Sequence, residues 1–263
     1  MSDRSQRKSS RIETILQRLR VNGSLNIIEL CQQCRASVAT IRRDLQELET
    51  RGLLHRTHGG AVSLEPLFYE AFRKDESFTD LIGRQAAEKR RIGQAAAEMI
   101  EPGNAISLTH GTTTAEVIRC LRYGSGIKVV TNAVNIAMEL SKRKDIEVFV
   151  TGGHLWGDRF SLVGSAAIDA LRQVNVDIAF LGADGIDPSA GLTCRSPEEA
   201  AVNRVIVKQA RKRIVVIDHT KFGVVASWSV CRVEDCAMII TDKATAKKLI
   251  EPYVKRGVEV RRV

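Results

Sequence analysis

The first sixty residues alternate between apolar and polar positions in a way that predicts three short helices. The first is expected over residues 11–21 and the second over residues 27–33, where Asn26 supplies a polar cap. A third is expected after Ser37, because apolar side chains then recur three and four residues apart and share one helical face. Those apolar side chains are Val38, Ile41, Leu45 and Leu48. Three short helices with a tight turn before the third form a helix-turn-helix.

The polar face of the third predicted helix carries Thr40, Arg42 and Arg43. In a helix-turn-helix this helix enters the major groove of DNA, with its N-terminal residues toward the base edges. Arginine donates two hydrogen bonds to guanine or pairs with a phosphate, so this context favours DNA contact over two solvated charges. We expect Asp44 to be an internal salt-bridge partner, because DNA phosphates would repel a free carboxylate. The stretch that runs into Gly59-Gly60 is interpreted as a β-wing.

From residue 105 onward, short apolar runs alternate with amphipathic helical stretches. Strands are expected at 105–108, 128–131, 147–150, 177–181, 214–218 and 238–241. Helices are expected at 115–121, 133–143, 165–173, 198–210 and 244–255, and another over 79–100 with Lys89 outside and Ile92 inside. This alternation predicts a Rossmann-like α/β domain with a largely parallel sheet.

Polar residues and glycines follow several of these predicted strands. Gly111, Thr112, Thr113 and Thr114 lead from the first strand into a helix, where backbone and hydroxyl donors can bind an anion. Further strand ends carry Asn132, Gly152 and Gly153, residues 182–185, and residues 218–223. Each is also compatible with an ordinary turn, but five at one sheet edge favour a small polar ligand. Lys221 is the candidate charge partner of a phosphate, with a solvated loop lysine as the alternative.

Charge is unevenly distributed along the 263 residues. Residues 1–62 hold 11 Lys and Arg against 6 Asp and Glu, so this quarter of the chain supplies +5 of the net +9. A basic N-terminal region is compatible with a polyanionic partner such as DNA, although charge alone would not exclude a solvated surface.

The six cysteines include a Cys31-x-x-Cys34 pair, which raises the question of zinc. No second CxxC or histidine pair stands at a matching spacing, so we expect packed free thiols, no metal and no cofactor. The first eleven residues lack the apolar core of a secretory signal, and no apolar run approaches the ~20 residues of a membrane span. We therefore expect a cytoplasmic protein that does not enter the membrane.

The segment IRRDLQELETRGLLHRTHGGA resembles the DNA-binding region of the DeoR family of bacterial transcriptional regulators. The resemblance implies a winged helix-turn-helix over residues 8–63, with the helix-turn-helix itself at about 25–44. A linker over 64–78 and an effector-sensing domain over 79–263 would follow. Residues expected at the DNA are Ser37, Thr40, Arg42, Arg43, Arg56 and His58.

Segments of the second domain also resemble this family, in the family's order: ISLTHGTTTAEVI, VVTNAVNIAMEL, VTGG, AFLGADGID, GLT, EEAAVNR and VIDHTKFG. The resemblance implies a fold like that of ribose phosphate isomerase, used as a sensor of a phosphorylated sugar or related metabolite. It places residues 111–114 at the phosphate, with Asn132, Asp184, Glu199 and Lys221 around the rest. Two departures stand out, because Asp-Ser is common where Thr109-His110 stands and lysine is common at Asn203.

These observations predict a DNA-binding regulator, expected to be a repressor of a carbohydrate or polyol operon and to act as a dimer or higher homo-oligomer on operator DNA. A phosphorylated sugar or polyol would release it. The alternative is a sugar phosphate isomerase, with Asp184, Glu199 or His110 as a general base. Its acidic DGADE-like stretch is incomplete here, because Gly185 follows Asp184. We therefore expect no enzymatic activity and assign no catalytic residue.

Overall fold

The computed structural model divides the chain into two compact units, Met1–Lys74 and Asp75–Val263. The structure describes residues 8, 10–12, 14–16, 18, 19, 24–50, 54–57, 59–63, 84–121, 124–141, 143–156 and 159–263. The predicted linker over residues 64–78 lies outside the described residues, and so does His58.

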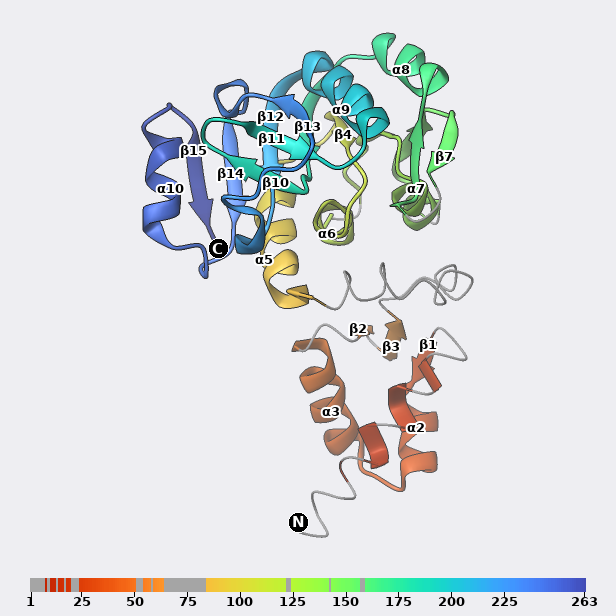
Figure 1. Cartoon of the computed structure of the whole chain (residues 1–263). Helices are drawn as coiled ribbons and strands as arrows, with labels where there is room; N and C mark the ends of the chain where they lie inside the picture. Colours follow the sequence, from red (N-terminus) through yellow and green to blue (C-terminus); the bar gives the residue numbers. More distant parts are fainter. Residues whose placement is uncertain are drawn as a thin grey trace. The chain divides into compact units, whose positions relative to one another are not determined.

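The first unit has the predicted helix-turn-helix and wing. Its labelled elements are β1 (Ser24–Asn26), α2 (Ile27–Cys34), α3 (Val38–Thr50), β2 (Leu54–Thr57) and β3 (Gly60–Ser63) (Figure 1). The described residues between 8 and 19 are helical, in agreement with the first predicted helix. Strand β3 pairs antiparallel with both β1 and β2, which gives the wing a third strand that the sequence did not indicate.

Apolar side chains from every element of the first unit meet in one core. Its buried members are Ile15, Leu19, Leu25, Leu30, Ile41, Leu45, Leu48, Leu54 and Ala61. Cys31 and Cys34 pack against this core as free thiols, as predicted. The placement of Val38 on the buried face was wrong, because α3 begins at this residue and only its later turns cover the core.

The second unit is built on a seven-stranded parallel sheet in the order β15-β14-β12-β9-β4-β5-β6. Its strands are β4 (Ala105–Leu108), β5 (Lys128–Thr131), β6 (Glu147–Val150), β9 (Val176–Leu181), β12 (Ala210–Val216), β14 (Met238–Thr241) and β15 (Glu259–Arg262). Its helices are α5 (Ala86–Ala97), α6 (Thr112–Arg119), α7 (Val134–Leu140), α8 (Ser165–Arg172), α9 (Pro197–Gln209) and α10 (Lys247–Val254). The predicted α/β class is confirmed.

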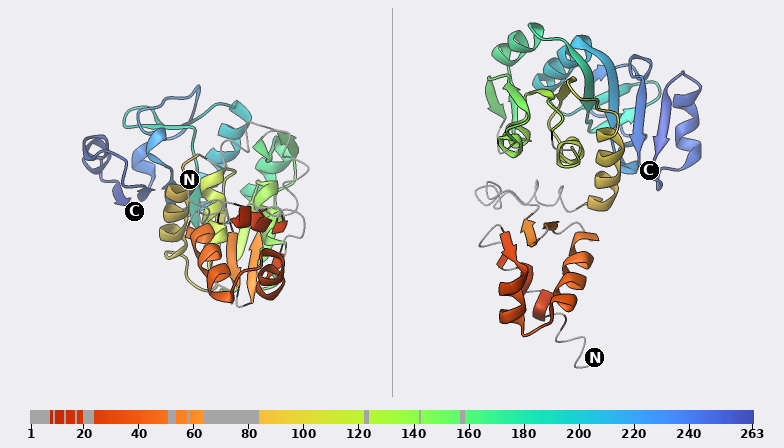
Figure 2. Two further views of the ribbon diagram at one scale, coloured as in Figure 1. Left: turned by 90° about the horizontal axis from the view of Figure 1, so that it is seen from below. Right: turned by 180° about the vertical axis from the view of Figure 1, so that it is seen from behind.

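Helices cover both faces of this sheet, as the two opposite views of Figures 1 and 2 show. Neighbouring residues of β9 show why both faces are apolar: Phe180 joins one core cluster, whereas Ala179 and Leu181 join the other. Successive side chains of a strand point to opposite faces, so a strand buried on both sides is apolar throughout.

Short antiparallel strands complete the second unit, and the apolar pattern had not indicated them. They are the hairpin β7 (His154–Trp156) with β8 (Ser161–Val163), and the sheet of β10 (Gly185–Asp187), β11 (Gly191–Cys194) and β13 (Trp228–Cys231). Two 3-10 turns, His219–Lys221 and Val233–Asp235, connect the later elements.

The chain changes direction across the sheet between β4 and β9. From β4 it proceeds outward to β5 and β6, whereas β9, β12, β14 and β15 extend toward the opposite edge. In open α/β sheets, ligands bind at the carboxyl ends of the strands at such a switch point. The ends of β4 and β9 are therefore the place to look for a ligand site.

Candidate functional site

Local hydrogen bonds set the turn and the start of α3, the predicted DNA-reading helix. Ser37 Oγ accepts a hydrogen bond from the Thr40 amide at 3.2 Å, which caps a backbone donor at the helix start. Asn26 caps α2 in the same way through the Ile28 amide at 2.8 Å. Arg35 closes the turn in the left-handed region, with φ of 46°. The turn between α2 and α3 is therefore stabilised by the backbone conformation of Arg35 and by the cap at Ser37.

The exposed face of α3 carries the predicted DNA-binding residues. Ser37, Arg42 and Arg43 are exposed and Thr40 is half-buried. Within the described part of the chain, no hydrogen bond or ion pair engages the guanidinium of Arg42 or Arg43. Both side chains are therefore available for DNA, while the opposite face of α3 holds the core.

Arg56 has a structural partner that the sequence did not indicate. Its Nε lies 2.7 Å from Glu49 Oε2, and its backbone amide donates to Glu49 Oε1 at 3.0 Å. These contacts fasten β2 to the end of α3. A contact between Arg56 and DNA stays a prediction, and it would have to compete with this ion pair.

Asp44 is the internal salt-bridge partner that the sequence predicted. Its carboxylate, 3% exposed, accepts hydrogen bonds from Arg11 Nε and Nη2. The hydrogen bond to Asp44 raises the pKa of Arg11 above its ordinary value. This pair joins the first helical segment to α3 and thereby fixes the orientation of the reading helix.

Asp44→Ala is expected to lower the free energy of unfolding of the first unit by about 3 kcal/mol, because Arg11 loses the carboxylate against which it is buried. The test is urea unfolding of the full chain, followed by circular dichroism. Both tryptophans, Trp156 and Trp228, belong to the second unit, so tryptophan fluorescence gives an internal control. Glu47→Ala is the matched variant, because its ion pair with Lys8 is exposed and contributes less than about 1 kcal/mol. Superimposable dichroism curves for Asp44→Ala and the wild type would contradict this role.

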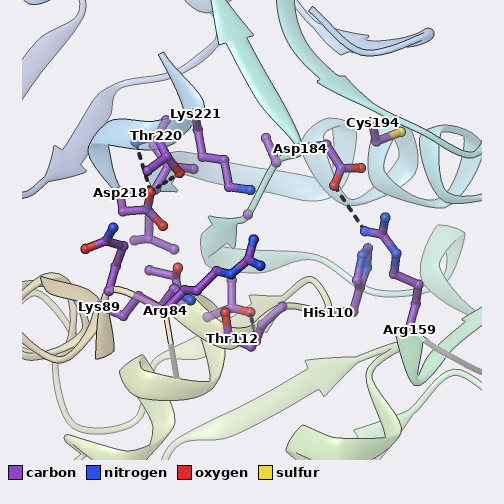
Figure 3. A pocket seen from close by; sticks show the side chains of 18 of the residues that line it. Arg84, Lys89, His110, Thr112, Arg159, Asp184, Cys194, Asp218, Thr220 and Lys221 are labelled. Carbon is purple, nitrogen blue, oxygen red and sulfur yellow. Dashed lines mark hydrogen bonds and ion pairs between the residues drawn. The ribbon is translucent and has the colours of Figure 1, made fainter. Parts of the chain in front are cut away.

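A pocket of about 280 Å³ opens at the switch point of the second unit. Residues after β4, β9 and β12 line it, together with the start of α5 (Figure 3). This volume lies near the lower end of the range for small-molecule sites, so it suits a metabolite better than a macromolecule.

The predicted anion-binding loop forms one wall of this pocket. Gly111 has φ of 142°, a conformation that favours glycine, and the first turn of α6 begins directly after it. Thr114 Oγ1 donates to Gly111 O at 2.9 Å, so this hydroxyl supports the loop. The amides of the first helical turn and the hydroxyls of Thr112 and Thr113 remain as donors for an anion.

The pocket includes some of the predicted effector residues and omits others. Gly111, Thr112, Thr113, Thr114, Asp184 and Lys221 line it, whereas Asn132, Gly152, Gly153 and Glu199 do not. Gly152 and Gly153 follow β6, an edge strand separated from β9 by β4 and β5. Asn132 is buried and donates to Ser161 Oγ and Leu162 O. Strand order is not recorded in any local pattern, so the prediction placed all five strand ends at the ligand. The pocket lining does not support that placement for the ends of β5 and β6.

Four cationic side chains in the pocket were not among the predicted site residues: Arg84, Lys89, Arg159 and Arg195. Lys89 was predicted to lie outside α5, but it is only 5% exposed. Burial lowers its pKa, and the charge of Asp218 partly offsets that effect. Arg159 lies between β7 and β8, strands that the sequence did not predict. Lys89 and Arg159 could not be assigned to the site from the sequence, because only the tertiary structure brings them into the same pocket as the anion-binding loop.

Asp184 is held by two arginines rather than left free. Arg159 Nη1 lies 3.1 Å from Asp184 Oδ1, and the Arg195 amide donates to Oδ2 at 3.0 Å. Burial favours a higher pKa for this carboxyl, but the charge and hydrogen bond of Arg159 outweigh it, so the pKa lies below its ordinary value. A carboxylate in this state is an acceptor for ligand hydroxyls and a poor proton carrier.

The three residues that depart from the pattern of the resembled family lie in the pocket or directly behind it. Thr109 is fully buried and its Oγ1 accepts from the Gly182 amide at 2.9 Å, which joins the loops after β4 and β9. His110 Nε2 lies 3.1 Å from Glu199 Oε1, within ion-pair distance but not aligned for a hydrogen bond. Asn203 lines the pocket and is 3% exposed.

The described residues contain neither a metal-binding cluster nor a membrane-spanning helix. Among the described residues, no group of three or more His, Cys, Asp or Glu is placed to hold a metal ion. Across those same residues, no helix has the length and apolar character needed to cross a bilayer.

Comparison with known proteins agrees with both halves of the structure. Residues 11–66 match the DeoR-like helix-turn-helix domain, and residues 84–243 match the DeoR C terminal sensor domain. The chain is 34% identical over 252 residues to the putative aga operon transcriptional repressor of Escherichia coli O157:H7, covering 96% of this chain and 93% of that protein. It is 31% identical over 217 residues to the glycerol-3-phosphate regulon repressor of Escherichia coli K12, covering 82% and 84%.

Among solved structures, ribose 5-phosphate isomerase A of Methanocaldococcus jannaschii is similar, with a TM-score of 0.38 and 19% identity over 52% of this chain and 54% of that one. The relatives matched over most of their length are regulators, which decides against the isomerase alternative. The chain belongs to the DeoR family of helix-turn-helix transcriptional regulators.

Proposed function

We propose that this regulator represses a carbohydrate or polyol utilisation operon and is released from its operator by a phosphorylated sugar or polyol bound in the second unit. The observation that carries the proposal is the pocket at the switch point, where the start of α6 meets several cationic side chains. A phosphate is the common metabolite group that fits both features, because helix N-termini and cations each favour a dianion.

Lys221 is the cation best placed for a phosphate. Its side chain reaches from the turn after β12 toward the space above Thr112, and Arg84 approaches the same space (Figure 3). Within the described residues, no hydrogen bond or ion pair engages the Lys221 ammonium group. A ligand phosphate would supply the partner, with hydrogen bonds from Thr112 and Thr113 and from the first turn of α6.

The names of the relatives support the same chemical class. One is a glycerol-3-phosphate regulon repressor and another an aga operon repressor. Both names describe control of an operon or regulon, and the first includes a phosphorylated polyol. For the present chain we propose a phosphorylated sugar or polyol as the class of effector, and the ligand screen below is designed to identify its carbon skeleton.

Operator binding is proposed to involve at least two copies of the chain. A two-fold symmetric operator presents two half-sites, and each half-site needs one reading helix. Release then requires only that the effector bind more tightly to the conformation that cannot bind DNA. A coupling of about 1–3 kcal/mol between the two sites would change operator affinity by roughly 5- to 150-fold.

The proposal is tested by a thermal-shift screen of phosphorylated sugars and polyols, each paired with its unphosphorylated parent. A ligand of the folded state raises apparent stability, by about 2.7 kcal/mol at a hundred times its Kd. We expect a phosphorylated compound to raise Tm and its unphosphorylated parent to leave Tm unchanged. A screen in which sugars act without phosphate, or in which no phosphorylated compound acts, would contradict the proposed effector class.

Operator affinity is expected to fall steeply as salt rises, because basic side chains release counterions from DNA. If each dimer contacts six or more phosphates, affinity should drop roughly 10³-fold between 50 and 200 mM salt. Fluorescence anisotropy with a duplex selected from random sequence by the wild-type protein measures this slope. An affinity that hardly changes over that range would argue against phosphate contacts by the first unit.

A further inference from the structure

The two ends of the pocket differ in charge. Lys221, Lys89 and Arg84 gather at one end, where Asp218 is the acidic neighbour (Figure 3). Three formal positive charges therefore face one negative charge, and this is the end to which the phosphate is assigned.

The opposite end is close to neutral, because Arg159 and Arg195 are balanced by Asp184 and by Glu199. Figure 3 shows His110, Asp184 and Arg159 there, and Arg159 and Asp184 form an ion pair at 3.1 Å. Behind His110 lies the carboxylate of Glu199, which is 1% exposed. A second anionic group on the ligand would contact Asp184 and lie near the buried charge of Glu199 here, without the excess of cations found at the other end.

Asn203 lies beside Glu199 in the wall of this neutral end. The two residues stand four positions apart on α9 and therefore occupy the same helical face. Asn203 is 3% exposed, and no described residue forms a hydrogen bond with its Oδ1. A buried amide oxygen without a partner is costly, which points to a ligand group as its missing donor. The side chain offers a donor and an acceptor whichever way its amide is turned, so it suits a hydroxyl.

We propose that Asn203 determines effector specificity: with Glu199 behind it, it selects phosphorylated compounds whose remote end is an uncharged, hydroxyl-bearing carbon over those that end in a carboxylate. This inference rests on the proposed function, because it assumes that the phosphate occupies the cationic end. Asn203 forms a hydrogen bond with the terminal hydroxyl, and Glu199 disfavours a negative charge at the same place.

Pairs of compounds that differ only at the terminal carbon test this directly. Glycerol 3-phosphate is compared with 3-phosphoglycerate, and sorbitol 6-phosphate with 6-phosphogluconate, by titration calorimetry on the full chain. In each pair CH₂OH is replaced by a carboxylate and the phosphate is kept. We expect the wild type to bind the hydroxyl member of at least one pair about ten-fold more tightly than its carboxylate partner.

Two substitutions separate specificity from folding. Asn203→Leu keeps the branched shape of the side chain and removes the hydrogen bond, so affinity for the preferred hydroxyl compound should fall about ten-fold. Asn203→Lys adds a cation beside Glu199, so the preference for the hydroxyl member over the carboxylate member should shrink or reverse. Lys208→Ala, at an exposed position of the same helix, should change neither value. The Tm of each variant without ligand verifies that it is folded.

The outcomes also separate this proposal from the proposed function. Equal affinity for both members of every pair, or an affinity ratio unchanged in both Asn203 variants, overturns the role of Asn203 and leaves the phosphate site intact. Failure of all four compounds and of inorganic phosphate to bind the wild type overturns both. If the preference for the hydroxyl member is lost in Asn203→Leu and shrinks or reverses in Asn203→Lys, both the role of Asn203 and the proposed function are supported.

Discussion

The double variant Arg42→Ala/Arg43→Ala should lose at least about thirty-fold in affinity for specific DNA while folding normally. Each arginine is exposed on the face of α3 opposite the core, and a base or phosphate contact by arginine contributes about 1–3 kcal/mol. The folded structure itself should be unaffected, because within the described chain neither guanidinium forms a hydrogen bond or ion pair. Anisotropy with a duplex selected by the wild-type protein measures the loss.

The matched control removes two arginines from the second unit instead. Arg172→Ala/Arg211→Ala carries the same change in net charge, and both side chains are exposed, at 66% and 84%. It should retain nearly full affinity for the selected duplex. If both double variants lost affinity equally, the effect would be one of net charge, and the assignment of α3 as the reading helix would be wrong.

Lys221→Ala is expected to leave operator affinity unchanged and to remove most of the response to the effector. A hydrogen bond between charged groups contributes about 1.5–3 kcal/mol, so the effector concentration for half-release should rise roughly 10- to 150-fold. Thr113→Ala should act in the same direction with a smaller effect, since it removes one neutral donor. The measurement is release of the labelled duplex as the effector found in the thermal-shift screen is titrated.

Lys248→Ala serves as the control, because this lysine is exposed on α10 and absent from the pocket lining. It should release DNA at the wild-type effector concentration. If Lys221→Ala and Thr113→Ala both respond like Lys248→Ala, the phosphate does not bind at the start of α6, and the effector site must be sought elsewhere.

Much of the fold could be predicted because local patterns and tertiary burial agree. Three of the four residues of β4 are apolar, and they lie in a strand buried on both faces. Such a short run between turn signals is typical of a buried strand. The starts of α2 and α3 could be predicted from Asn26 and Ser37, because a capping side chain bonds to a backbone amide only two or three residues further along the chain. The short strands could not be predicted, because their local sequence does not indicate a strand. For example, β15 reads Glu-Val-Arg-Arg, and only its pairing with β14 makes it a strand.

The site could be predicted only in part, because it depends on strand order. The anion loop at residues 111–114 is local and was found from its own residues. The choice among the other strand ends required knowing that β4 lies next to β9, which no local pattern records. Lys89 illustrates the same limit, since its charge suggested the surface whereas the fold buries it beside the phosphate end of the pocket.

The central claim is that a phosphorylated compound bound in the pocket of the second unit controls DNA binding by the first. The most direct test titrates that compound into the complex of full-length protein and selected duplex, for the wild type and for Lys221→Ala, while calorimetry follows its binding to the free protein. We predict that the wild type releases DNA over the concentrations at which the pocket fills, and that Lys221→Ala needs at least about ten-fold more. Binding that leaves operator affinity unchanged, or equal release from both proteins, would contradict it.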